Sequence, residues 1–476
     1  MCDWFFRAMR GTLKIALIAT LVSLCWGSDG WGGRLEDLLL ENKQITIDQW
    51  VQLKAEEEKR EAKVMEESRG VGDVPVRERW YEKISVRGYT QFRYNFGQQN
   101  DLLTSPGDRS IVKNNEFFMR RARLIVSGQP HDRVFVYLQA EFAGLVNNQE
   151  NTTVLKDAYA DIFLTENKEW RIRPGLSKIP FGFETLQSSQ NRLAFDRNDA
   201  TFSSVPNERN LGVFLYYTPT VVRERFRRLV ESGLKGSGDY GMLGIGVYNG
   251  QAIDQQDANK NKHVIFHSAY PYEFSNGQIV QVGMDAYTGQ SVVSTFPVVP
   301  TNPSLTNGSY ISPQVTNGGN YLDERVVWHL VVFPQPFGIQ AEYLIGRGPQ
   351  LNNARTAVEL GSLHGGYVQL FYNYQCDTYC QSIFPYVRMQ EYFGAQKLQS
   401  NAPQQSVRET ELGLEYQFNR ALELTVAYSW TQRTSRDSAT LPFGTCSLSG
   451  SPVSCTQTPY QLHTGNLIRL QLQWSF

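Results

Sequence analysis

From residue 84 to the C-terminus, apolar and polar residues alternate with a period of two in segments of roughly ten residues. In the first segment Phe92, Tyr94 and Phe96 alternate with Arg93 and Asn95. This pattern is typical of transmembrane β-strands, which turn the apolar face to lipid and the polar face to a lumen. We predict sixteen strands, at residues 84–96, 117–127, 133–143, 155–164, 170–178, 209–218, 240–250, 263–274, 278–288, 325–334, 338–346, 365–374, 384–394, 408–418, 421–431 and 464–476.

The spacing of these segments predicts the connections between them. Long external loops are expected at 97–116, 179–208, 289–324, 347–364 and 432–463, and short periplasmic turns at 128–132, 165–169, 335–337 and 419–420. Segment 219–239 is long yet falls on the periplasmic side, and its four arginines predict a solvated basic turn, with contact to an acidic partner as the alternative. The predicted fold is all-β, a sixteen-stranded antiparallel transmembrane β-barrel wide enough for an aqueous channel.

The last strand carries the clearest pattern. Ile468, Leu470, Leu472, Trp474 and Phe476 form an uninterrupted apolar face that ends in two aromatic residues. Aromatic residues favour the membrane–water boundary, so this strand is expected to close the barrel on the first one and to end at the periplasmic side.

The N-terminal region differs from the barrel. Three basic residues, the short apolar stretch 15–26 and small residues after it predict a signal peptide over residues 1–27, with cleavage within 27–33. Lipidation of Cys25 and a membrane-anchor helix are the alternatives. Residues 34–68 have helical periodicity and predict a short periplasmic helical segment, either a solvated helix or part of a trimeric coiled coil. A linker follows at 69–83, and the barrel occupies 84–476.

Composition narrows the class of protein. Outside the N-terminus no apolar run reaches the length of about 18 residues that a membrane-spanning helix needs. The formal net charge is -1, from 46 basic and 47 acidic residues, which gives no reason to expect nucleic acid as a partner. We predict no cofactor and no catalytic residues, because none of the barrel histidines belongs to a motif that couples it to a nucleophile.

The cysteines that remain after export are four in number. Cys376 and Cys380 fall in a predicted periplasmic turn, and Cys446 and Cys455 in the last external loop. An even number in an oxidising compartment predicts two local disulfides. A metal site is the alternative, but no histidine or acidic cluster lies beside either pair, and we predict no metal.

Basic residues recur on the polar faces of the first, second and fifth predicted strands. A charge on the lipid face near the bilayer midplane costs about 2–4 kcal/mol, so these side chains are expected to line the lumen and to form a path for anions. The predicted pore-lining residues are Arg87, Arg93, Arg120, Arg121, Arg123, Arg171, Arg173 and Lys178.

The loop at 179–208 is the candidate constriction. It is long, it has apolar residues with which to pack, and it carries Glu184, Arg192, Asp196 and Arg197, so we expect it to fold into the lumen and narrow it; display outside the barrel is the alternative. Basic and acidic residues are nearly balanced from Arg120 to Glu208, which predicts a constriction of mixed charge.

Several segments resemble the phosphate-selective porin O and P family. They are FFMRRARLIVSG (117–128), LKDAYADI (155–162), RPGLSKIPFGFE (173–184), ERNLGVFLYY (208–217), GVYNG (246–250), PYVRMQEYFG (385–394), ELGLEYQFN (411–419) and the terminal Phe476. Arg120 and Arg121 match the paired arginines of that family's second strand, whereas Tyr89 stands where a further channel arginine is expected. The resemblance implies a homotrimeric barrel with arginines along the channel and phosphate or pyrophosphate as solute.

We therefore expect a channel in the outer membrane of a Gram-negative-type bacterium, surrounded by outer-membrane lipid, for passive diffusion of small hydrophilic solutes. A preference for small anions such as phosphate is the sharper hypothesis. The alternatives are a general non-selective porin and a membrane-anchored structural tether without transport.

Overall fold

The computed structural model describes residues 83–97, 115–146, 149–251, 257–295, 305–306, 309–310, 315–353, 356–376, 378–436, 446–447, 454–455 and 460–476. The predicted signal peptide, the helical segment at 34–68 and all but the last residue of the linker lie outside these ranges. Among the described residues, no helix combines the length and the apolar character needed to cross a membrane.

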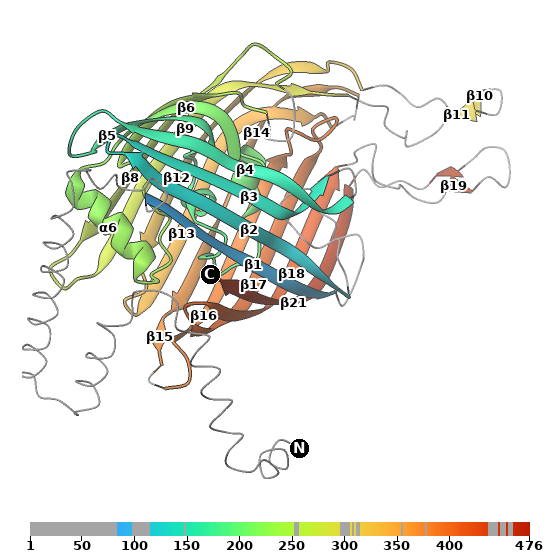
Figure 1. Ribbon diagram of the computed structural model, residues 1–476. Helices are drawn as coiled ribbons and strands as arrows, with labels where there is room; N and C mark the ends of the chain where they lie inside the picture. Colours follow the sequence, from blue (N-terminus) through green and yellow to red (C-terminus); the bar gives the residue numbers. More distant parts are fainter. Residues whose placement is uncertain are drawn as a thin grey trace, which may run out of the picture. The chain divides into compact units, whose positions relative to one another are not determined.

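The chain forms a closed antiparallel β-barrel (Figure 1). Its sheet has seventeen strands, of which β15 has only two residues; the other sixteen close the barrel, as predicted. The sixteen are β1 (Ile84–Gly97), β2 (Glu116–His131), β3 (Val134–Val146), β4 (Gln149–Phe163), β5 (Trp170–Lys178), β6 (Arg209–Tyr217), β7 (Leu243–Tyr248), β8 (His263–Glu273), β9 (Ile279–Val293), β12 (Gly319–Val332), β13 (Phe337–Leu351), β14 (Val358–Tyr372), β16 (Ser382–Ala395), β17 (Gln404–Asn419), β18 (Leu422–Arg436) and β21 (Tyr460–Ser475).

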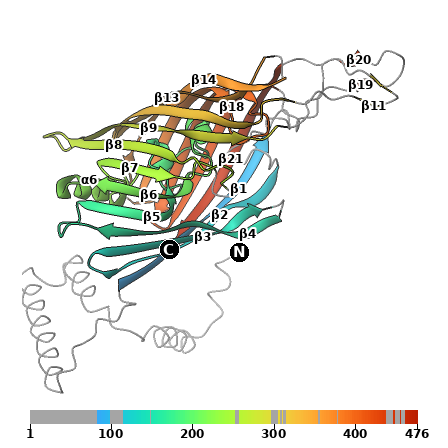
Figure 2. The same cartoon turned by 90° about the horizontal axis from the view of Figure 1, so that it is seen from above.

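The remaining elements are short and lie in connections. They are β10 (Leu305–Thr306), β11 (Ser309–Tyr310), β15 (Tyr374–Gln375), β19 (Cys446–Ser447), β20 (Ser454–Cys455), α4 (Phe183–Leu186), α5 (Asp199–Ser204) and α6 (Thr220–Glu231). In both ribbon views α6 lies at one end of the barrel (Figures 1 and 2). We call this end, where β1 begins and β21 ends, the periplasmic end.

The predicted strands agree with the observed ones in number and order but are often too short at the external end. β9 continues to Val293 rather than ending at 288, and β12 begins at Gly319 rather than at 325. Three of the five outward positions in these extensions are polar, namely Gln290, Asn320 and Glu324, so the hydrophobic alternation weakens while the backbone ladder continues. The missed residues extend the wall beyond its apolar band.

The prediction of a solvated turn at 219–239 was wrong, because twelve of its residues form α6. Val222, Phe226 and Leu229 lie at helical spacing and are buried, which gives this arginine-rich helix one apolar face. The four arginines of this segment suggested a solvated turn, although the three apolar residues at helical spacing indicate a helix.

The barrel has the opposite polarity to that of a soluble protein. Five of its most completely buried large side chains are arginines, namely Arg93, Arg197, Arg325, Arg433 and Arg469. Outward positions of the strands instead expose Val, Leu, Ile and aromatic side chains. A lipid-facing wall accounts for both observations, because lipid covers the apolar exterior and the polar side chains meet inside.

The C-terminal strand closes the barrel against both β1 and β18. The backbone amide of Gly88 donates to the carbonyl of Phe476 at 2.9 Å, and the amide of Phe476 donates to the carbonyl of Gly88 at 3.0 Å. A Cβ at position 88 would lie 2.5 Å from the Phe476 ring and 2.5 Å from the carbonyl oxygen of Arg123. The seam between the first and last strands therefore requires glycine at this position.

We predict that Gly88→Val weakens closure of the barrel by about 1–3 kcal/mol, the usual cost of forcing extra volume into a packed contact. The variant should lose its compact, heat-modifiable form on semi-native electrophoresis at a lower temperature than the wild type.

Thr90→Val, which adds no volume to the seam and lies two residues further along the outward face of β1, is the matched control. If the Gly88 variant and the wild type lost the compact form at the same temperature, position 88 would not be critical for closing the first strand on the last.

Candidate functional site

The lumen carries the charged residues that the sequence assigned to it. Arg93, Arg121, Arg123, Arg171 and Arg173 all lie on inward positions of β1, β2 and β5 and are buried within the barrel. Arg87 is also inward but exposed, near the periplasmic end of β1. Further charged residues of the lumen lie on strands outside the predicted anion path, and they include Arg209, Arg325, Arg388, Arg433 and Glu411. The alternation that located the first group also holds for these.

Adjacent arginines on β2 are accommodated by a β-bulge. The register against β1 pairs Gln91 with Arg121 and Phe92 with Met119, which leaves Arg120 as the extra residue. Arg121 donates to the Gln91 side-chain oxygen at 2.7 Å. Arg120, Arg121 and Arg469 are all close enough to Arg93 for their charges to act on it. The bulge thus brings two consecutive arginines to one group in the lumen.

The connection between β5 and β6, residues 179–208, which is the candidate constriction loop, folds into the lumen. Every residue from Ile179 to Gln187 and from Arg192 to Val205 is buried. Its apolar side chains, among them Ile179, Phe181 and Val205, pack against inward residues of β6 to β17. One half of the lumen is therefore filled by apolar contacts.

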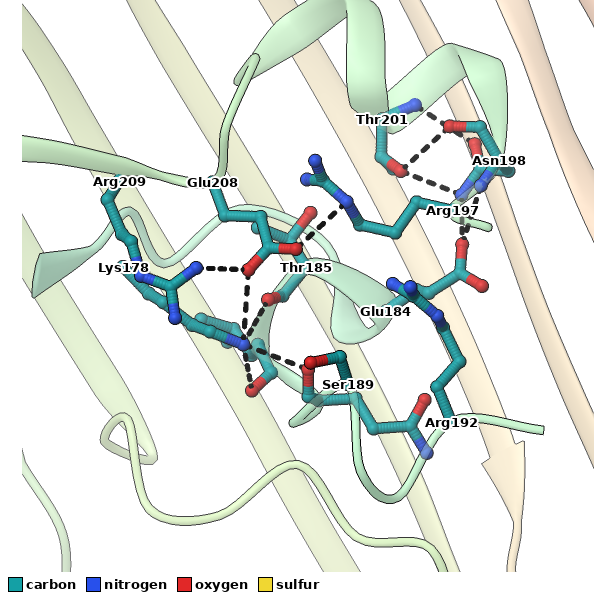
Figure 3. A network of polar contacts seen from close by, with 12 residues as sticks. Lys178, Glu184, Thr185, Ser189, Arg192, Arg197, Asn198, Thr201, Glu208 and Arg209 are labelled. Carbon is teal, nitrogen blue, oxygen red and sulfur yellow. Dashed lines mark hydrogen bonds and ion pairs between the residues drawn. The ribbon is translucent and has the colours of Figure 1, made fainter. Parts of the chain in front are cut away.

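The start of this constriction loop is held by Lys178. Its ammonium group donates to the carbonyl oxygens of Thr185, Leu186 and Gln187 at 2.8, 3.1 and 2.9 Å, at the C-terminal end of α4 (Figure 3). The positive charge also suits the negative end of the helical turn. Lys178 therefore fixes the fold of the loop in this structure.

The end of the loop is organised around Glu208. Its carboxylate accepts from Arg209 at 2.6 Å and from Arg197 at 3.1 Å, and it lies 3.6 Å from the Lys178 ammonium group (Figure 3). Arg209 in turn pairs with Asp157 of β4 at 3.0 Å. Both ends of the loop are thus tied to one carboxylate and, through it, to the wall.

Three acidic residues of the loop reach arginines of the far wall. Glu184 pairs with Arg388 of β16, Asp196 with Arg469 of β21, and Asp199 with Arg433 of β18. Asp196 also lies 3.5 Å from Arg93 of β1. The loop therefore crosses the lumen and is attached on its opposite side by charge.

Arg192 makes two hydrogen bonds within the loop. Its guanidinium group donates to the carbonyl oxygens of Ala194 at 3.1 Å and Phe195 at 3.4 Å. Its charge also acts on the Glu184 carboxylate. All four constriction residues named from the sequence thus lie in the loop that enters the lumen.

The buried position of Glu184 affects its protonation. Burial alone would raise the pKa of this carboxyl group, but the Arg388 guanidinium, at 3.0 Å in one of its two contacts, holds the pKa below the ordinary value for glutamate. The backbone amide of Asn198 donates to the same carboxylate at 2.8 Å. Glu184 therefore remains an anion at neutral pH.

The predicted pore-lining arginines on the near wall are also paired. Arg123 binds Glu141 at 2.7 Å, Arg171 binds Asp239 at 2.9 Å, and Arg173 binds Asp161 at 2.6 Å. These pairs hold the guanidinium groups in place and neutralise much of their charge. The lumen therefore contains a network of residues of opposite charge.

An excess of positive charge is found in a recess of about 490 Å³ below the constriction loop. Its lining includes Arg87, Arg123, Lys168, Arg171, Arg173, Lys178, Arg209 and Arg223, but only Asp157, Asp161 and Asp239 as acidic residues. The difference is 8 − 3 = +5, and adding Glu141 and Glu208, which pair with two of these arginines from outside the lining, leaves +3. Tyr137, Tyr159 and Tyr240 complete the recess.

The cysteine pairs lie away from this region. Cys376 and Cys380 form a disulfide in the connection between β14 and β16. Cys446 and Cys455 are backbone partners in the β19–β20 hairpin. Within the described residues, no group of three or more His, Cys, Asp and Glu side chains is arranged to hold a metal ion.

The sequence pattern of the phosphate-selective porin O and P family matches residues 87–447. No curated protein sequence matches the chain.

Several solved structures have a similar fold at low sequence identity. OmpF of Salmonella typhi, in complex with daunomycin, is 13% identical over 83% of this chain and 97% of its own, with a TM-score of 0.48. The outer-membrane channel DcaP of Acinetobacter baumannii is 12% identical over 83% and 97%, with a TM-score of 0.47. An anion-selective porin from Comamonas acidovorans is 8% identical over 83% and 99%, with a TM-score of 0.44.

We predict that Glu184→Gln loosens the constriction loop, because Arg388 keeps its charge in a buried position without a carboxylate partner. Breaking a buried pair in this way costs about 3–5 kcal/mol. Purified barrels should show faster cleavage within 179–208 by added protease and larger fluctuations of single-channel current.

Acidification should have the same effect on the wild type. A carboxyl group with a lowered pKa in the folded state stabilises the fold above its unfolded pKa, and this contribution is lost as the pH falls through the folded value. Glu359→Gln, at an exposed position on β14, is the control. If this variant and the Glu184 variant show the same protease cleavage and the same current fluctuations at all pH values, the Glu184–Arg388 pair does not hold the loop.

Proposed function

The chain belongs to the phosphate-selective porin O and P family, and from this premise we propose that it is an anion-preferring channel with phosphate among its solutes. The family makes it an outer-membrane channel of a Gram-negative-type bacterium, and a channel rather than an enzyme. The preference for anions and the particular solute are our proposals, as is assembly into a homotrimer, which the family resemblance implies.

The observation that carries the proposal is the positive excess of the recess below the constriction loop. Its formal surplus of three charges is concentrated in about 490 Å³, between the constriction and the periplasmic exit. A lumen region lined by one sign of charge and walled by low-dielectric protein concentrates ions of the opposite sign. Anions that pass the constriction therefore enter a region that attracts them.

The paired state of the arginines suits transport better than tight binding. Arg171 and Arg173 already contact carboxylates, so an anion would exchange contacts with them rather than fill an empty site. Conduction needs binding that is favourable enough for entry and weak enough for release. Guanidinium groups can also offer paired N–H donors to phosphate oxygens, which supports phosphate as one of the solutes.

General diffusion without selection is the second candidate, because the constriction itself is mixed. Glu184, Asp196 and Asp199 face arginines across the lumen, and opposed charges at a constriction admit solutes of either sign. Selectivity measurements separate the two candidates.

In planar bilayers with a potassium chloride gradient, we predict a reversal potential that reports chloride preference. Arg87→Gln should reduce that preference, because it removes an exposed positive charge from the recess. An exposed charge contributes on the order of 0.5 kcal/mol, so the anion-to-cation permeability ratio should fall on the order of twofold. Arg408→Gln, on the outer wall of β17, is the control; cation preference of the wild type would refute the proposal.

Whether phosphate is a solute is tested by its ability to block the chloride current. If it uses the same path, phosphate at millimolar concentration should reduce the chloride current, and Arg121→Ala should weaken this block more than Arg408→Ala does. If the channel prefers chloride but phosphate does not block the current, the proposal of an anion channel stands and the proposal of phosphate as a solute is refuted.

A further inference from the structure

The connection between β6 and β7 begins at the periplasmic rim. The Thr220 amide donates to Glu169 in the β4–β5 turn at 2.9 Å, and Arg228 pairs with Glu273 at the end of β8 at 2.6 Å. Val222 and Phe226, from the apolar stripe of α6, pack on Ala269 and Met242. α6 is thus fastened to the rim along its length.

After α6 the chain turns into the lumen and crosses it. The Lys235 ammonium group pairs with Glu415 of β17 and lies 4.8 Å from the centre of the Phe384 ring of β16. In the closed strand order, β17 is seven steps from β7 in one direction and eight from β6 in the other, which places it on the opposite side of the barrel. Residues 232–241 therefore span the periplasmic mouth.

The crossing segment is held under the constriction loop. The side-chain amide of Gln187 donates to the Lys235 carbonyl oxygen at 2.7 Å. Asp239 binds Arg171 through both carboxylate oxygens at 2.9 Å, which secures the returning end. The segment thus contacts the loop above it and both walls of the barrel.

Lys235 adopts a conformation that needs external support. Its φ is 64°, in the left-handed region that side chains other than glycine rarely occupy. Its side chain is 5% exposed and that of Glu415 is 1% exposed. Burial of an ammonium group and a strained backbone are both unfavourable, and the pair with Glu415 offsets these costs where the segment reaches β17.

The two sides of the crossing segment differ. Toward β9 and β12, Leu234 of the segment and Leu229 of α6 pack with Phe183 of the constriction loop and with Ile279, Val331 and Phe333 of the wall. On the side of β1, the basic recess and a second cavity of about 250 Å³ at the exit share Arg87, Gln190 and Asn191 in their linings. One side is sealed by apolar contacts, and the other is open and polar.

We propose that the β6–β7 connection is a second constriction at the periplasmic exit, which directs solutes along the β1 side of the lumen past Arg87. Lys235 is a positioning residue in this arrangement, because it holds the crossing segment against β17 without itself selecting the solute. The inference rests on the channel activity but not on the preference for anions.

The test is single-channel recording of the full-length protein with Lys235→Ala and Glu415→Gln combined, so that neither charge is left buried without its partner. Release of the crossing segment should raise the conductance on the order of twofold, since conduction depends on the width of the pore. The matched control is Lys262→Ala combined with Asp257→Asn, which removes an ion pair with an exposed lysine outside the lumen.

The route past Arg87 is tested in the same recordings. Arg87→Gln should shift the reversal potential in the wild type and shift it by less than half as much in the Lys235/Glu415 variant. Glu415→Gln alone keeps a hydrogen-bond acceptor for Lys235 and should give an intermediate conductance. This single variant replaces the double variant in the test if the double variant does not insert into the bilayer.

The second constriction would be overturned if the Lys235/Glu415 variant had the same conductance as the wild type. If that variant does not insert, the same conductance in Glu415→Gln would overturn it. An equal effect of Arg87→Gln in both backgrounds would overturn the route along β1. A cation-preferring wild type would refute the proposed anion preference while leaving the conductance comparison valid, so the two failures can be distinguished.

Discussion

Hydrocarbon offers no hydrogen-bond partners to the peptide backbone, and this constraint underlies the whole structure. A sheet can cross a membrane only when it closes on itself, so that each strand has neighbours on both sides. Closure is completed where Gly88 and Phe476 exchange backbone hydrogen bonds. Once the sheet is closed, the two-residue period of a strand decides which side chains contact lipid and which contact the lumen.

The same period concentrates charge inside the barrel. Arginines from β1, β2, β5, β6, β12, β16, β18 and β21 meet in a confined space, where each guanidinium group needs an anion or a carbonyl oxygen as partner. The constriction loop supplies several of these partners through Glu184, Asp196, Asp199 and Glu208. Its position is therefore set by ion pairs on one side and by apolar packing against β6 to β17 on the other.

Two connections thus enter the lumen. The constriction loop enters from the external side and the β6–β7 connection from the periplasmic side, and they meet where Gln187 binds the carbonyl oxygen of Lys235. Both leave the region beside β1 to β5 polar, and that region retains the excess positive charge. The anion preference and the second constriction are separate proposals about this one half of the lumen.

The sequence by itself determined the barrel, the number and order of its strands and the lumen position of residues such as Arg93 and Arg173, because alternation is a local property. The loop at 179–208 could also be assigned to the lumen from its length and its apolar residues. Only the tertiary structure decided the partners, since Glu184 meets Arg388 across 204 residues and Lys235 meets Glu415 across 180. Curvature of a closed wall brings such residues together, and no local pattern records which positions will face each other across a lumen.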